Sequence, residues 1–135
     1  MRHKARTCLL TVFGLLLPAV PALAHHSFAA EFDGNQPTEI TGTISKVQWI
    51  NPHAYVWIDG KDASGKAVTF AVESRSPGEL SRLGLTKAKL LGKTVTVHSY
   101  LAKDGSKNLS FLRSIKVDGN EYEVWRAGEP LNDRP

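Results

Sequence analysis

The sequence predicts a mainly β protein, in which five strands form a Greek-key barrel and one short helix lies between the third and fourth strands. Three observations support this prediction. Apolar and polar residues alternate in five separate segments, turn-forming residues separate most of these segments, and one helix-start signature falls in the middle of the series. We place the barrel at residues 38–126, after an N-terminal arm at 25–37 and before a polar tail at 127–135.

The first 24 residues have the three parts of a secretory signal peptide. Three basic residues stand within the first six positions, residues 8–20 form an apolar run without charge, and Ala22-Leu23-Ala24 fits the small-x-small cleavage pattern. The apolar run is shorter than the roughly 20 residues that cross a bilayer. We therefore predict cleavage after Ala24, a periplasmic or secreted location, and no membrane contact after cleavage.

Cleavage changes what the composition implies. The leader holds Cys8, the one cysteine, so the mature domain forms no disulfide and depends on its apolar core. The leader also holds three of the 17 Lys and Arg and none of the 13 Asp and Glu, which leaves 14 basic residues against 13 acidic ones. A nearly neutral domain has no general attraction for polyanions, and we expect no nucleic-acid partner.

The first predicted strand starts at Thr38 and contains a bulge. Apolar and polar residues alternate over 40–44, and then the phase slips so that Val47 and Trp49 continue the apolar face. The arm before this strand shows no sustained period, and its expected anchors are two phenylalanines, Phe28 and Phe32.

Turn signals separate the later strands. Asn51-Pro52 ends the first strand, and the composition of residues 62–66 is typical of a hairpin turn. The remaining predicted strands cover 55–59, 68–73, 95–100 and 109–117, with a short last strand at 121–125.

The predicted helix follows the third strand. Ser76 is the N-cap, Pro77 takes the first helical position, and Glu79 completes a capping box. Its apolar side is formed by three leucines, Leu80, Leu83 and Leu85, and one more helical turn is expected over 86–91. Three strands, a helix and two strands match the order of the OB-fold. A small β-sandwich or an open meander with one helix is the alternative.

Three motifs of the chain are specific. They are the segment from His25 to Asp33, which contains His-His-Ser-Phe, the segment from Gly42 to Ala54, which ends in Asn-Pro-His-Ala, and Val72-Glu73-x-x-Ser76-Pro77. These motifs resemble a family of small exported bacterial proteins that is known only as a domain of unknown function. The resemblance runs from about His25 to Ile115, and the chain after Lys107 departs from the family's pattern. It implies a periplasmic location and an OB-like barrel, with no activity to carry over.

Metal binding at the new N-terminus is the first functional hypothesis. Cleavage after Ala24 gives His25 both a free amine and an imidazole, and His26 adds a second ring. Copper(II) favours such nitrogen ligands in a tetragonal arrangement, and His53 completes the set if the arm folds back. The alternative is a flexible terminus in which the two histidines have no role in the fold.

A small-ligand site is the second hypothesis, because aromatic and amide side chains gather where OB-folds present ligands. The residues concerned are Trp49, Asn51, Tyr55 and Trp57. In the alternative interpretation, Trp49 and one of the other two aromatics belong to the core, and Asn51-Pro52 only forms the turn.

Catalysis has little support in this sequence. It contains no nucleophile elbow, no glycine-rich phosphate loop and no His-Glu-x-x-His or Cys-x-x-Cys spacing. We interpret His98 as a solvated strand residue and four acidic residues as scattered surface carboxylates: Glu31, Asp33, Asp59 and Glu73. The alternative is that two of these carboxylates meet across the barrel as an acid–base pair. The sequence therefore predicts a periplasmic binding or accessory module for a metal or small ligand, with a protein-interaction module that binds no metal as the alternative.

Overall fold

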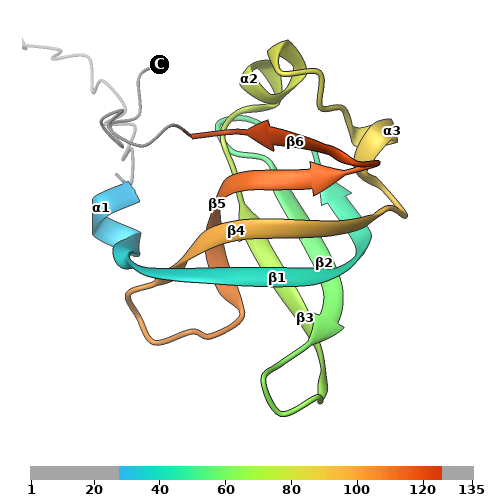
Figure 1. The fold of residues 1–135 in the computed structure, drawn as a ribbon. Helices are drawn as coiled ribbons and strands as arrows, with labels where there is room; N and C mark the ends of the chain where they lie inside the picture. Colours follow the sequence, from blue (N-terminus) through green and yellow to red (C-terminus); the bar gives the residue numbers. More distant parts are fainter. Residues whose placement is uncertain (1–27, 126–135) are drawn as a thin grey trace, which may run out of the picture.

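The computed structural model describes residues 28–125 (Figure 1). The predicted signal peptide, His25, His26 and the polar tail lie outside the described residues. Within 28–125, no helix is long and apolar enough to cross a membrane. The elements in chain order are α1 (Phe28–Glu31), β1 (Phe32–Gln48), β2 (Tyr55–Lys61), β3 (Ala67–Glu73), α2 (Pro77–Arg82), α3 (Lys87–Leu90), β4 (Thr94–Ala102), β5 (Leu109–Val117) and β6 (Asn120–Glu123).

The strand pairings form a closed, OB-like barrel. β1 pairs antiparallel with both β2 and β4, β2 pairs with β3, and β4 pairs with β5. A parallel pairing of β3 with the start of β5 closes the ring. These pairings agree with the predicted fold class. β6 is a sixth strand outside the ring, antiparallel to the second half of β5 (Figure 1).

β1 is longer than the sequence indicates, since it begins at Phe32 and not at Thr38. Its first residues are mostly exposed and polar, so no alternating pattern marks them. The predicted bulge is confirmed by a register shift between Ile44 and Lys46. At Gly42 the strand passes so close to β2 that a Cβ would overlap the backbone of Asp59, and this position therefore requires glycine.

The barrel interior is aliphatic. Its fully buried side chains alternate along the strands with outward-facing ones, as expected for a closed sheet. The core members with 0–2% exposure are Ile44, Ala54, Ile58, Val72, Leu80, Leu85, Leu90, Val95, Val97, Ile115 and Val117. Three partly buried aromatic residues, Trp49, Phe70 and Tyr122, pack against this core.

A second cluster, the aromatic cluster, is separate from the barrel core. Phe28 is 6% exposed, and its ring lies 5.2 Å from Phe111 and 5.7 Å from Trp125, centroid to centroid. Phe32 and Tyr100 complete the cluster. The two phenylalanines of the arm are thus anchors, as predicted, and they attach α1 to the outside of the sheet.

The short helix predicted after β3 and the further helical turn expected over 86–91 are both present, as α2 and α3. The capping box of Ser76 and Glu79 starts α2, and Thr86 caps α3. Leu80 and Leu85 are buried, but the prediction for Leu83 is wrong, because α2 ends at Arg82 and leaves Leu83 38% exposed.

Candidate functional site

The connection between β1 and β2 is bound to the end of β3. The Ser74 amide donates to the Ala54 carbonyl at 2.8 Å, and the Ala54 amide donates to the Arg75 carbonyl at 3.1 Å. Ala54 is completely buried. These two hydrogen bonds place His53 beside Glu73, the last residue of β3.

One buried carboxylate links a histidine and a tyrosine at this place. His53 Nδ1 contacts Glu73 Oε1, and the Tyr55 hydroxyl donates to Glu73 Oε2 at 2.6 Å. Glu73 is only 5% exposed, so the interpretation of Glu73 as a surface carboxylate is wrong. Both of its oxygens have protein partners, as a buried carboxylate requires. We refer to His53, Tyr55 and Glu73 as the histidine–carboxylate site.

A charge on the N-terminal helix contributes to the raised pKa of Tyr55. Burial raises the pKa of Tyr55 above its ordinary value near 10, and the hydrogen bond to Glu73 and the negative charges of Glu73 and Glu31 raise it further. Each effect disfavours the phenolate, because an anion loses hydration on burial and is repelled by nearby carboxylates. Glu31 belongs to α1, so α1 lies close enough to influence this site.

Phe28, the first described residue, packs on a neighbour of the histidine–carboxylate site. Glu73 is opposite Phe111 in the parallel β3–β5 pair, and the Phe28 ring packs on Phe111. Neighbouring strands are about 4.8 Å apart. Phe28, three residues after His25, is therefore separated from Glu73 by one aromatic ring and one strand spacing.

The predicted aromatic residues divide between two environments. Trp57 and Tyr55 point outward from β2, with ring centroids 6.0 Å apart, and the Lys46 ammonium lies 4.2 Å from the Trp57 ring centroid. Trp49 instead packs, half-buried, against the barrel core, while Asn51 is exposed in the connection. Of the predicted site residues, the structure brings together His53, Tyr55 and Trp57.

The described residues do not supply a metal site by themselves. No group of three or more His, Cys, Asp or Glu side chains that could hold an ion occurs within 28–125. The predicted metal ligands are His25, His26 and His53, and two of these lie outside the described residues. Any site of this kind therefore depends on the residues that precede α1.

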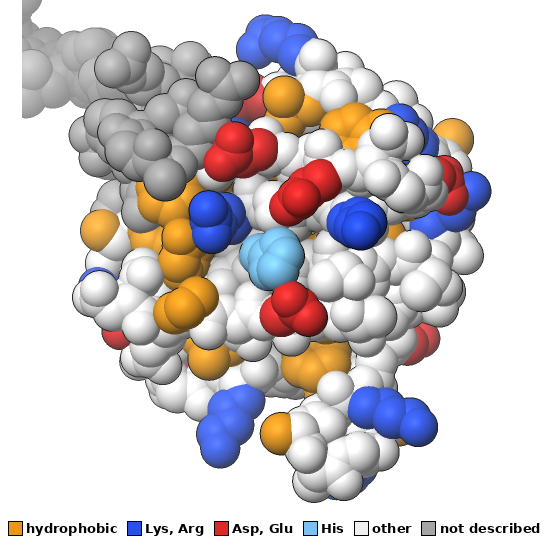
Figure 2. All heavy atoms as spheres, in the orientation of Figure 1, with side chains coloured by type: hydrophobic (Ala, Val, Ile, Leu, Met, Phe, Trp, Pro, Cys, Tyr) orange, Lys and Arg blue, Asp and Glu red, His pale blue; other side chains and the backbone are white. Residues whose placement is uncertain are grey.

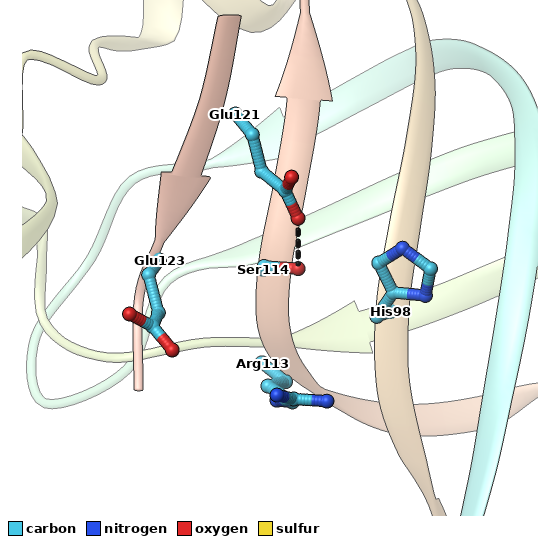
Figure 3. A pocket seen from close by; sticks show the side chains of 5 residues that line it. All are labelled: His98, Arg113, Ser114, Glu121 and Glu123. Atoms are coloured by element: carbon cyan, nitrogen blue, oxygen red, sulfur yellow. Dashed lines mark hydrogen bonds between the residues drawn. The ribbon is translucent and has the colours of Figure 1, made fainter. Parts of the chain in front are cut away.

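A second polar feature, which the sequence did not indicate, lies on the outer face of β4, β5 and β6. It is a surface hollow of about 460 Å³, and Figure 2 shows one histidine on this face with acidic and basic side chains around it. Figure 3 shows the five residues that line it: His98, Arg113, Ser114, Glu121 and Glu123. The one sequence pattern that could have indicated this hollow is the spacing of Glu121 and Glu123, which places both side chains on one face of a short strand.

Comparisons with known proteins identify a family and a distant structural likeness. The model of a family of unknown function, DUF6152, matches residues 14–110. A search of curated proteins found no match. Two crystal structures of the mitochondrial single-stranded DNA binding protein Rim1 from S. cerevisiae are similar at 13% identity. They have TM-scores of 0.46 and 0.43, and the matches cover 66% and 64% of this chain and 96% and 93% of theirs. The OB-like topology rests on the strand pairings described above.

Proposed function

This chain belongs to the DUF6152 family of unknown function, and we propose that it is an exported binding module that holds copper(II) between its N-terminal histidines and His53. The observation that carries the proposal is the contact between His53 and the buried carboxylate of Glu73. Three steps connect this contact to metal binding.

The first step concerns the orientation of the His53 ring. Metal-binding histidines typically donate one ring N–H to a carboxylate, which fixes the ring and its tautomer. Glu73 occupies Nδ1 of His53, and Tyr55 holds the other carboxylate oxygen. The nitrogen that meets an ion is therefore Nε2, on a ring whose orientation is set before binding.

The second step is that the N-terminal histidines are close in sequence to a residue that packs near His53. His26 precedes Phe28 by two residues, which span at most about 7 Å. The Phe28 ring packs on Phe111, and Phe111 lies opposite Glu73. Phe28, where the described chain begins, thus lies close to the part of the barrel that carries His53.

The third step concerns the ligand set. Cleavage after Ala24 gives His25 an α-amine with an intrinsic pKa of about 7.7 to 8.0, which loses its proton readily when a metal binds. Together with the rings of His25, His26 and His53, this amine makes a nitrogen set that suits copper(II). The proposal requires export, because this amine exists only after the leader is cleaved.

Copper titration of the mature chain tests this function. Calorimetry would compare the chain that begins at His25 with the same chain acetylated at its N-terminal amine and with His53→Ala. We expect each change to weaken copper binding by at least about tenfold, and the matched control His98→Ala to bind as the wild type does. Equal affinity in all four proteins would refute the proposal.

The alternative function is a protein-interaction module without a metal. Its contact surface would include exposed apolar side chains, and the large ones within 28–125 are Ile50, Leu83 and Leu91. Ile50, which is 48% exposed, lies in the same connection as His53. Failure of the mature chain to bind copper would favour this alternative.

A further inference from the structure

The hollow on the β4–β5–β6 face is built on a straight row of side chains. Glu39 of β1 lies opposite His98 of β4, His98 lies opposite Ser114 of β5, and Ser114 lies opposite Glu123 of β6. Directly opposite residues have Cβ atoms about 5 Å apart on one face of the sheet. An acid, an imidazole, a hydroxyl and a second acid therefore cross four strands in one line.

A β-bulge adds a guanidinium to this row. His98 pairs with Ser114 and Ser99 pairs with Leu112, so Arg113 is the extra residue in β5. The Arg113 carbonyl accepts hydrogen bonds from the amides of Val124 and Trp125, which fix the bulge. The bulge allows both Arg113 and Ser114 to line the hollow, although neighbours in a regular strand face opposite sides.

The guanidinium of Arg113 has no partner within the described part of the chain. Its side chain is half-buried, yet no hydrogen bond or ion pair joins it to any side chain or carbonyl in 28–125. Arginine presents five donors in a planar fork that matches a carboxylate. The hollow thus offers an unused carboxylate-binding group.

The acidic groups stand on the other side of the hollow. Glu121 accepts a hydrogen bond from the Ser114 hydroxyl at 3.1 Å, and Glu123 is exposed on the same strand (Figure 3). Neither forms an ion pair with Arg113 within the described residues, so the opposite charges share a hollow without neutralising each other. A ligand that carries both charges could satisfy both groups.

We propose that this hollow binds a small zwitterion, an amino acid or dipeptide with a free ammonium and a free carboxylate. The ligand's carboxylate pairs with the Arg113 fork, and its ammonium lies between Glu121 and Glu123. The volume of about 460 Å³ admits a ligand of this size, and an adjoining hollow of about 240 Å³ that includes Tyr100 offers room for a side chain. This site is independent of the copper proposal.

Binding of three matched dipeptides tests the proposal. The probes are L-alanyl-L-alanine, its N-acetyl derivative, which lacks the ammonium, and its C-terminal amide, which lacks the carboxylate. Two-dimensional NMR of the full mature chain, with EDTA present, would follow the amides of the hollow. We expect the zwitterion to shift them and each blocked peptide to bind at least about tenfold more weakly.

Variants identify the groups that recognise the ligand. Arg113→Gln keeps the bulge, which depends on the backbone, and is expected to weaken zwitterion binding by about tenfold or more. Arg113→Lys, which keeps the charge but not the fork, is expected to fall between Arg113→Gln and the wild type. The matched control Lys61→Gln removes an exposed cation at the β2–β3 end and is expected to have no effect. Absence of binding, equal binding of the three peptides, or unchanged binding by Arg113→Gln would overturn the proposal.

Discussion

The two histidines of the described chain, His53 and His98, both contact a glutamate, but the two glutamates differ in burial. The side chain of Glu73, beside His53, is 7% exposed, whereas that of Glu39, 3.6 Å from His98, is 62% exposed. Both histidines have Nδ1 as the contacting atom. The difference between the two pairs therefore lies in the surroundings and not in the chemistry.

This difference shows how a fold converts a common residue pair into a positioned group. A buried carboxylate must be paired, so the partners of Glu73 are held in one geometry. An exposed pair is weakened by water and salt and leaves both side chains free to move. His53 is consequently suited to a fixed ligand such as a metal ion, and His98 to an open surface that adapts to its ligand.

Phe28→Ala is expected to have the largest effect on stability, because it removes the side chain that anchors α1 beside the histidine–carboxylate site. Phe28 is 6% exposed, and its loss is expected to lower the free energy of unfolding by about 3 kcal/mol, measured by urea denaturation. Copper affinity should fall as well. A variant with unchanged stability would show that the aromatic cluster does not hold α1.

Glu73→Gln has the next largest expected effect. An amide in place of the carboxylate directs an N–H group at one of two donors, His53 or Tyr55, and is expected to cost about 1–3 kcal/mol of stability. Copper affinity is expected to drop by about 10- to 100-fold, as it does when other carboxylates that hold a metal-binding histidine in place are removed. The matched control Glu39→Gln should change stability by less than about 0.5 kcal/mol. Equal effects of the two substitutions would remove the distinction between the pairs.

Tyr55→Phe sharpens the comparison through pH. The pKa of Tyr55 is higher in the folded protein than in the unfolded chain, so protonated Tyr55 stabilises the fold. This stabilisation is complete below about pH 10 and is lost as the pH rises through the folded-state pKa. At pH 7 the variant is expected to lose about 1 kcal/mol with the hydrogen bond to Glu73. Above about pH 10 the wild type should lose stability more steeply than the variant, in urea midpoints measured across this range. Parallel curves for the two proteins would contradict the assignment.

Much of the fold was predictable, because alternation and turn residues act locally. The bulge after Ile44 was visible as a slip in the apolar phase, and the Ser76 capping box was visible as a short motif. The early start of β1 was not, because Asp33 to Gln36 are polar and face solvent. The residue that starts the strand, Phe32, pairs with Ala102 of β4, which lies far away in sequence, and residues 33–36 have no partner in that ladder.

The candidate sites were less predictable, because burial of a polar residue is a tertiary property. Glu73 alternates with Val72 as a surface residue would, and only the neighbouring β1–β2 connection and β5 bury it. Arg113 gave no signal, because the bulge that exposes it arises from pairing with β4. His53 was among the predicted site residues, but Glu73, the buried carboxylate beside it, was not.

NMR with substoichiometric copper(II) tests the central claim most directly, because the paramagnetic ion broadens the signals of the nearest groups first. The mature chain beginning at His25 would be titrated while the ring signals of His53 and His98 are followed in one sample. We expect the His53 signals and those of neighbouring Tyr55 to disappear early, while His98 stays sharp. Early broadening of His98, or a sharp His53 throughout, would contradict the account.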